Sequence, residues 1–428
     1  AYKTDKAISA IIVIIIIKMK DEILAFLNDP GQLEKMYRSN KALFKKEFAS
    51  LYPDVTGNPV ADTWNERLNF ESESVTWGSG RELLIIIGAS LLAGLIAKIP
   101  AIFAIDEEFF FPRNIGFIIF PILSAYFAWK NNLPKEKIAV IFTAMLAGLL
   151  FINTRPLPET DTLILSCIHL VLFLWAMTGF AFVGGIKGSN SKRMEYLKYN
   201  GDLVVMTTLI LIAGGIMSAV TIGLFNLIGF KIEDFYFDYF GIIGVAAAPV
   251  VATYLTQTNP QLVGKVSPVI AKIFSPLVLV MLMVFLGAMI FSGKDPYNDR
   301  EFLIIFNALL VGVMALIFFS AAETSRGSRS RADIWILLLL SVLTIVVNSV
   351  ALSAILFRIS EWGITPNRAA VLGANILILV NLILVSAQLY KHLTKKTDPA
   401  EIGNAIARYL PVYVVWTVIV TFIFPFIF

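Results

Sequence analysis

Residues 333–357 read DIWILLLLSVLTIVVNSVALSAILF. After Asp333 no charged side chain occurs before the end of this stretch, and Leu, Ile and Val dominate it. The hydrocarbon core of a bilayer is about 30 Å thick, so a helix needs about 20 apolar residues to cross it. The stretch is therefore long and apolar enough to be a transmembrane helix.

Similar stretches recur along most of the chain. The eleven predicted spans are 83–105, 114–129, 137–152, 161–184, 203–229, 235–257, 266–292, 302–322, 333–357, 366–390 and 409–428. Charged residues make up 15% of the sequence, against about 25% in soluble domains, and the mean hydropathy is +0.77. We expect an all-α polytopic transmembrane helix bundle of about eleven spans. The spans 114–129 and 137–152 are short, so they either form a tilted pair or a re-entrant hairpin.

Lysine and arginine alternate between rich and poor loops, which orients the predicted bundle. The loop around 187–198 contains four basic residues, whereas the loops before and after it each contain one, Arg155 and Lys231. Basic residues mark cytoplasmic loops. The pattern predicts an inner (cytoplasmic) membrane protein with its N-terminus in the cytoplasm and Phe428 in the periplasm. Since these loops account for the net charge of +4, a nucleic-acid partner is not expected.

The N-terminal region divides into two parts before the transmembrane domain at 83–428. Residues 1–18 contain the apolar run AIIVIIII and precede Met19, so they are interpreted either as an upstream extension or as a membrane-surface segment. Residues 19–82 are charged, with apolar residues at helical spacing around 33–51. We expect two or three short cytoplasmic helices that pack on the membrane domain or on a protein partner, because about 60 residues bury only a marginal core.

Motif content excludes several function classes. The chain contains one cysteine, Cys167, and two histidines, His169 and His392, that are far apart, so neither a disulfide nor a Cys/His metal site is expected. No P-loop, HExxH, GxSxG or dinucleotide motif occurs. No cofactor is expected, and an enzymatic role is the less favoured interpretation.

Few ionisable residues lie within the predicted spans, where such residues are candidate sites by default. Lys98 and Lys272 lie near span ends, where a lysine stem can extend to the interface, and His169 lies deeper, next to Cys167. The uncharged polar residues within spans are Asn226, Thr253, Asn307, Asn348, Asn375, Asn381 and Gln388. Such side chains usually make helix–helix contacts, and a substrate pathway is the alternative.

The predicted outer loops gather charged and aromatic residues. The candidate outer-face cluster comprises Asp106, Glu107, Glu108, Arg113, Arg155, Asp238, Arg358, Trp362, Thr365 and Arg368. Thr365 before Pro366 predicts a capped helix start. The two arginines of the last outer loop, Arg358 and Arg368, are expected to pair with the acidic residues; the alternative is that they bind an anionic headgroup or phosphate.

At residues 358–368 (RISEWGITPNR) the chain resembles domain-of-unknown-function family 4153, whose members are polytopic bacterial membrane proteins. The family's pattern there looks like Arg-Ile, an aromatic-Gly pair, Thr and then Arg. Residues 106–129 (DEEFFFPRNIGFIIFPILSAYFAW) are similar to those of members associated with Bacteroidota. The resemblance covers roughly residues 20–428 and implies a class of membrane protein without an activity.

Three functions remain open at this point. The first is a transporter-like protein, for a solute or a lipid, or a membrane subunit of a larger assembly. The second is a membrane-embedded transferase that acts on a lipid-linked substrate at the outer face; the short first outer loop of this chain argues against it. The third is a scaffold that recruits a cytoplasmic partner through residues 19–82. Membrane lipids are expected partners in each case.

Overall fold

The computed structural model divides the chain into two units, residues Ala1–Thr76 and Trp77–Phe428. We call them the N-terminal unit and the membrane unit, and each is described by itself. The structure describes residues 19–69, 79–155, 160–185, 189–227, 230–260, 262, 266–291, 297, 300–324, 331–395 and 397–428. The prediction for residues 1–18 therefore lies outside the described residues.

The N-terminal unit contains three helices, α2 (Pro30–Ser39), α3 (Lys41–Val55) and α4 (Pro59–Asn69), after a helical segment at 19–25. The side chains of Asp29 and Asn40 accept hydrogen bonds from backbone N–H groups at the starts of α2 and α3, which fixes these two boundaries. This confirms the prediction of two or three short helices in this region.

The N-terminal unit has a hydrophobic core of its own. Phe44, Phe48 and Leu51 of α3 are at most 1% exposed, and Trp64 of α4 packs against Phe44 with ring centroids 5.3 Å apart. Aromatic pairs of this kind stabilise a small core beyond the area that they bury. The expectation that the segment packs on another surface is therefore not needed to explain how it buries its apolar residues.

A charged network covers one side of this core. Glu34 of α2 accepts a hydrogen bond from Arg38 at 2.7 Å and forms an ion pair with Arg67 of α4 at 2.8 Å. The guanidinium carbon of Arg67 lies 4.5 Å from the ring centroid of Trp64. The hydrogen bond from Arg38, together with the charge of Arg67, lowers the pKa of the Glu34 carboxyl.

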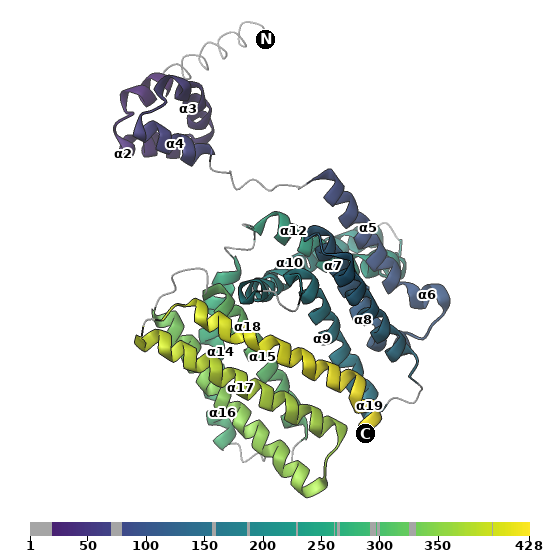
Figure 1. Cartoon of the computed structure of the whole chain (residues 1–428). Helices are drawn as coiled ribbons and strands as arrows, with labels where there is room; N and C mark the ends of the chain where they lie inside the picture. Colours follow the sequence, from purple (N-terminus) through teal and green to yellow (C-terminus); the bar gives the residue numbers. More distant parts are fainter. Residues whose placement is uncertain are drawn as a thin grey trace. The chain divides into compact units, whose positions relative to one another are not determined.

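Helices are the regular secondary structure of the membrane unit among the residues that the structure describes (Figure 1). Its helices are α5 (Gly80–Ala97), α6 (Ile99–Phe103), α7 (Glu107–Lys130), α8 (Lys135–Asn153), α9 (Asp161–Val183), α10 (Asn190–Leu227), α11 (Glu233–Tyr236), the π-helix η1 (Phe237–Gly241), α12 (Ile242–Thr258), α14 (Val266–Phe291), α15 (Arg300–Thr324), α16 (Arg331–Trp362), α17 (Pro366–Lys395), α18 (Ala400–Val418), the π-helix η2 (Ile419–Ile423) and α19 (Phe424–Ile427). All-helical architecture is what hydrocarbon requires, since helices pair every interior backbone group internally.

Each predicted span corresponds to a helix or to a continuous series of short helices. Within the described residues, ten helical segments are long and apolar enough to cross a membrane, and α15 contributes a shorter apolar segment, Phe306–Ala322. The two spans predicted to be short are longer than expected. α7 has 24 residues and α8 has 19, which correspond to about 36 Å and 28 Å of helix. Both are therefore long enough to cross.

The membrane unit has two hydrophobic cores. The first is built by α5, α7, α8, α9 and α12, and the second by α14 to α18. The start of α10 belongs to both, because Tyr196 and Tyr199 lie in the first core while Met194 and Leu197 lie in the second. Residues three apart lie on the same side of a helix, whereas residues one or two apart point to different sides, so this part of α10 joins the two cores.

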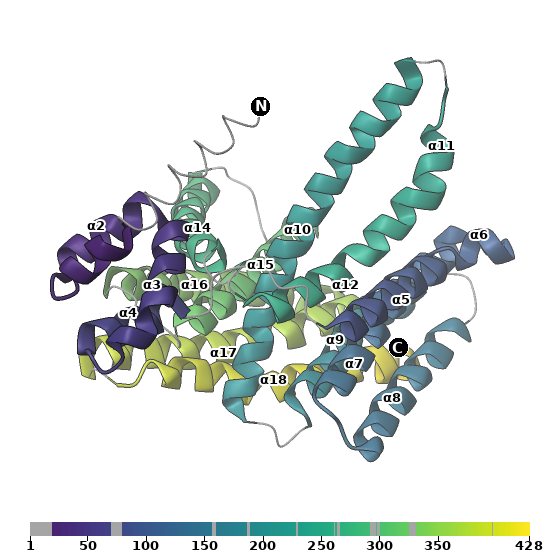
Figure 2. The ribbon, with the colours of Figure 1, turned by 90° about the horizontal axis from the view of Figure 1, so that it is seen from above.

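The second half of α10 leaves these cores. It runs alongside α11 and α12 as a hairpin that projects beyond the neighbouring helices (Figure 2). Only 6% of the most apolar part of α10 is buried, and residues such as Ile216, Met217 and Leu224 are more than half exposed. Lipid tails are as apolar as these side chains, so a helix exposed on nearly all sides is compatible with a bilayer.

The ion-pair network of the N-terminal unit leads to a pH-dependent prediction. Because its pKa is lowered in the folded state, Glu34 stabilises this unit above its unfolded pKa, and the stabilisation is lost as the pH falls through the folded pKa. Glu34→Gln should lower the melting temperature of a fragment of residues 19–69 at neutral pH, and the difference from wild type should vanish as the pH falls below the lowered pKa of Glu34. Circular dichroism melts measure both values. Glu66→Gln is the control, and an equal shift in this variant contradicts the assignment.

Candidate functional site

Three buried asparagine side chains of the membrane unit lie on α17 and on its neighbour α16. Asn348 of α16 and Asn381 of α17 are 0% exposed, and Asn375 of α17 is 1% exposed. Asn348 donates a hydrogen bond to the backbone oxygen of Asn375 at 3.2 Å, and Asn381 donates one to the hydroxyl of Tyr413 on α18 at 3.1 Å. The amides therefore connect α17 to α16 on one side and to α18 on the other.

These amides are only partly satisfied. Oδ1 of Asn348, Nδ2 of Asn375 and Oδ1 of Asn381 are buried and have no hydrogen-bond partner in the part of the chain that the structure describes. A buried polar group without a partner costs about 1–3 kcal/mol. Asn375 and Asn381 are six residues apart, which places them about 9 Å apart along the axis and on different faces. The arrangement is two polar contacts near mid-span, with unused hydrogen-bonding capacity on both faces of α17.

The three ionisable residues predicted within spans are separate from these amides and from one another. Lys98 lies at the break between α5 and α6, with Nζ 4.7 Å from the ring centroid of Tyr239. Lys272 of α14 forms an ion pair with Asp333 of α16 at 3.7 Å, and its side chain is 66% exposed. Nδ1 of His169 lies 2.8 Å from the backbone oxygen of Leu165, one turn earlier. Each has a local partner, and no two of them share a site.

The acidic residues of the first predicted outer loop stabilise the start of α7. Asp106 caps the helix by accepting a hydrogen bond from the backbone N–H of Glu108 at 2.9 Å, and Glu107 and Glu108 occupy the first turn. Negative charges at a helix N-terminus interact favourably with the helix dipole. Asp238, in η1, is exposed. All four carboxylates are exposed to the surroundings of the chain.

The loop between α16 and α17 is organised by its own arginines. Arg368 donates to the backbone oxygens of Trp362 at 2.9 Å and Gly363 at 2.7 Å, and Arg358 donates to the backbone oxygen of Tyr297 at 2.8 Å. Both guanidinium carbons lie within 6 Å of the Trp362 ring centroid. Thr365 accepts a hydrogen bond from the backbone N–H of Arg368, which confirms the predicted cap at the start of α17.

Among the described residues, the expected pairing of these arginines with the acidic loops is not found, and Asp295 and Asp299 of the loop before α15 lie outside the described residues. Among the described residues, no ion pair joins Arg358 or Arg368 to Asp106, Glu107, Glu108 or Asp238. The physical reason is local. The carboxylates stabilise the start of α7, while Arg368 binds backbone carbonyls that the end of α16 leaves without intrahelical partners and Arg358 binds the carbonyl of Tyr297.

A second polar group lies where α7 begins and α8 ends. Asn114 and Asn153 exchange two amide hydrogen bonds of 2.9 Å, and their remaining amide hydrogens bond the backbone oxygens of Phe110 and Leu149. Arg155, just beyond α8, lies 4.2 Å from the ring centroid of Phe151. The amide pair ties the two helices together and satisfies the donors of both side chains.

Arg113, next to this amide pair, is the most deeply buried arginine that the structure describes, at 2% exposed. Its guanidinium turns back toward the start of α7, with Nη1 donating to the backbone oxygen of Phe109 at 3.1 Å and the guanidinium carbon 4.2 Å from the Phe109 ring centroid. Nε and Nη2 are buried and have no hydrogen-bond partner among the described residues. Because arginine keeps its charge in proteins, this is a buried cation with one unused edge.

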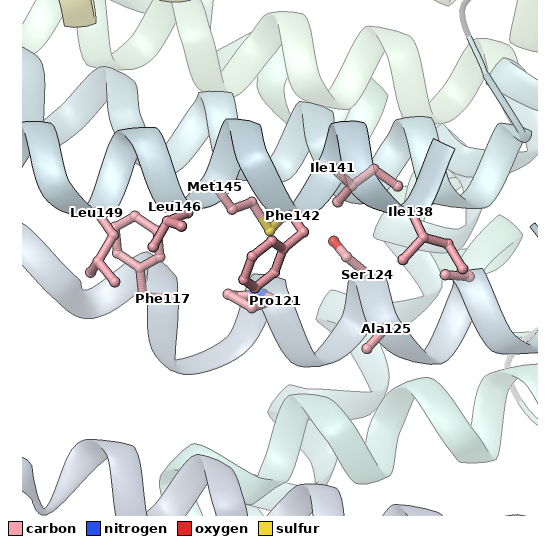
Figure 3. A pocket seen from close by; sticks show the side chains of 11 residues that line it. Phe117, Pro121, Ser124, Ala125, Ile138, Ile141, Phe142, Met145, Leu146 and Leu149 are labelled. Carbon is pink, nitrogen blue, oxygen red and sulfur yellow. The ribbon is translucent and has the colours of Figure 1, made fainter. Parts of the chain in front are cut away.

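An apolar groove of about 240 Å³ runs between α7 and α8 (Figure 3). The α7 side is lined by Phe117, Pro121, Ser124, Ala125 and Ala128, and the α8 side by Ile138, Ile141, Phe142, Met145, Leu146 and Leu149. The hydroxyl of Ser124 is hydrogen-bonded to the hydroxyl of Thr178 on α9 at 2.9 Å. This polar atom of the lining is therefore already paired. The groove therefore offers a ligand apolar surface only.

Sequence reasoning missed several of these residues. Asn114 and Asn153 lie at the ends of predicted spans, and Tyr413 was one aromatic residue among many. The network in which Tyr126 and Lys130 both bond the Glu82 carboxylate was also missed. An indication existed for Glu82 alone, because an acidic residue three positions after Ser79 is typical of a helix start.

No family model matches this chain, and no curated protein and no solved structure matches it significantly. Within the described ranges, no group of three His, Cys, Asp or Glu residues is placed to hold a metal ion. The fold therefore defines the class. The chain is a multi-pass α-helical membrane protein, with an N-terminal helical unit that has its own core.

The contact between Asn381 and Tyr413 leads to a stability prediction. Tyr413→Phe removes the hydroxyl and leaves Nδ2 of Asn381 without its partner, so the melting temperature in detergent should fall by the equivalent of about 0.6–1.7 kcal/mol. Tyr390→Phe, at an exposed position of α17, is the control. Equal shifts in the two variants would show that the contact contributes nothing specific.

Proposed function

We propose that this protein is a transporter-like, multi-pass protein of the bacterial inner membrane and a member of domain-of-unknown-function family 4153. The membership rests on the loop RISEWGITPNR at 358–368. Arg368 is hydrogen-bonded to the backbone oxygens of the Trp-Gly pair and the Arg358 guanidinium lies 5.8 Å from the Trp362 ring centroid, so these residues of the motif are in contact. A structural role for this loop agrees with a family defined by its sequence pattern.

The observation that carries the transport proposal is the unused hydrogen-bonding capacity around α17. A helix that only packs in a membrane pairs its polar side chains or carries few of them. Here one acceptor of Asn348, one donor of Asn375 and one acceptor of Asn381 are buried near mid-span without partners among the described residues. Polar groups at this depth are typical of transport pathways, where a polar solute or water completes their hydrogen bonds.

The chemistry of these groups favours an uncharged polar solute. The buried groups are amides, one of which bonds the phenol of Tyr413, and Lys272, one of the two lysines predicted within spans, is paired with Asp333. A charged solute would lose its hydration without gaining an opposite charge. Donors and acceptors are both available, so a solute with hydroxyl or amide groups matches them best.

Cysteine accessibility tests the pathway without a known substrate. In a Cys167→Ser background, Asn375→Cys and Asn381→Cys should react with a water-soluble methanethiosulfonate reagent in reconstituted vesicles, because a pathway admits water to mid-span. Leu384→Cys, on an exposed apolar position of the same helix, is the negative control, and Ser360→Cys in the loop is the positive control. Reaction of the two asparagine positions no faster than Leu384→Cys would reject the pathway.

The orientation proposal has a separate test. With the N-terminus in the cytoplasm, Ser39→Cys in the N-terminal unit should be labelled by a membrane-impermeant maleimide only after cells are permeabilised, whereas Ser360→Cys should be labelled in intact spheroplasts. Both residues are exposed in the structure. The opposite result would invert the orientation and leave the fold unchanged.

A further inference from the structure

Arg113 and the groove between α7 and α8 lie on the same side of α7. Arg113 and Phe117 are four residues apart, and Phe117, Pro121, Ser124 and Ala128 continue that side down the helix. Residues at this spacing lie one above the other along a helix. Asn114 and Asn153 join the helices at the end of the groove nearest to Arg113. A buried cation therefore lies at one end of an apolar channel that opens on the side of a membrane helix.

The unused edge of Arg113 determines what chemistry fits there. Nη1 is occupied by the Phe109 carbonyl, while Nε and Nη2 have no partner among the described residues. These two nitrogens form the side of the guanidinium that binds two oxygens of a phosphate or carboxylate in parallel. The neighbouring Asn114 and Asn153 have no amide hydrogen to spare. Of these three residues, only Arg113 has hydrogen-bond donors left for an anion.

The energetic cost of an unpaired buried cation supports a bound anion. A buried charge that has no partner is strongly destabilising. The acidic side chains that precede Arg113 on the same helix, Glu107 and Glu108, are exposed and make no ion pair with it. An anion from outside the chain would remove this cost. Arg113 lies near the start of α7, and the headgroups of a bilayer are found at the ends of membrane helices.

We propose that α7 and α8 form a binding site for an anionic phospholipid, with one acyl chain in the groove and the phosphate on Nε and Nη2 of Arg113. The groove volume of about 240 Å³ lies below the range of about 300–1,000 Å³ for small-molecule pockets, and it suits part of one chain. Phe109, which now lies over the guanidinium, is the side chain that moves to admit the phosphate.

The test is competition between lipids on the purified full-length protein. Native mass spectrometry should find phosphatidylglycerol bound in preference to phosphatidylcholine from an equimolar mixture. Arg113→Gln should lower this preference about tenfold or more, since it removes a charge-assisted pair of hydrogen bonds. Ala125→Phe, at an exposed position in the groove, should lower the binding of phosphatidylglycerol while leaving the guanidinium in place.

Two matched controls separate the site from general effects. Arg155→Gln removes the same charge from the other arginine near this end, which stacks on Phe151 and Phe426, and should leave the preference unchanged. Ala213→Phe adds the same ring to an exposed position of α10 and should leave binding unchanged. Ala125→Phe keeps the test valid if Arg113→Gln does not fold.

Three outcomes would overturn the proposal. If Arg113→Gln and Arg113→Lys both keep the full preference, the guanidinium does not bind the headgroup. If inorganic phosphate or glycerol phosphate displaces phosphatidylglycerol at equal concentration, the site binds a small anion rather than a lipid. If the wild type shows no preference for phosphatidylglycerol and Glu107→Gln combined with Glu108→Gln creates one, the partner of Arg113 is a carboxylate of this chain.

Discussion

Hydrocarbon cannot form hydrogen bonds, so every polar group within the bilayer core must find its partner in the protein. This constraint organises the membrane unit. Backbone groups are paired within the helices. Hydroxyl side chains follow the same rule, because Thr208, Ser218, Ser341 and Thr344 each donate to the backbone oxygen four residues earlier. Such bonds make serine and threonine nearly neutral in an apolar helix. Amides and guanidinium groups have more hydrogens than one carbonyl can accept, so they need further partners. They therefore mark contacts between helices and candidate binding sites.

Two pairs of asparagines show the difference. Asn114 and Asn153 exchange both of their amide bonds and give their remaining hydrogens to carbonyls of their own helices. Asn348 and Asn375 share a single bond to a backbone oxygen and leave an acceptor and a donor unused. The first pair behaves as a fastening between two helices. The second pair consists of the same residue type but leaves part of its hydrogen-bonding capacity unused. This makes α17 the candidate for a polar pathway.

Much of this fold is predictable from apolar runs, because burial in lipid requires length and low charge, and both are visible in a single sequence. The cap at Thr365 and Pro366 was also readable, since it depends on adjacent residues. The start of α7 was not. Hydropathy places the span from residue 114, whereas capping by Asp106 begins the helix at Glu107. Arg113 thereby moves from a loop to about two turns inside a helix. Its burial depends on packing between helices, which no local pattern contains.

The groove beside Arg113 follows from how α7 divides its contacts. On one side α7 approaches α9 closely, since a side chain at Gly116 would meet Leu174 at 2.8 Å, and Ser124 bonds Thr178. On the other side α7 presents Ala125, Ala128 and the N–H-free Pro121 to the larger side chains of α8. Small residues that face large ones without interlocking leave a channel, and a membrane fills such a channel with acyl chains. An arginine at the end of that channel then meets the headgroups first, so the packing preference of α7 and the charge of Arg113 select the same class of ligand.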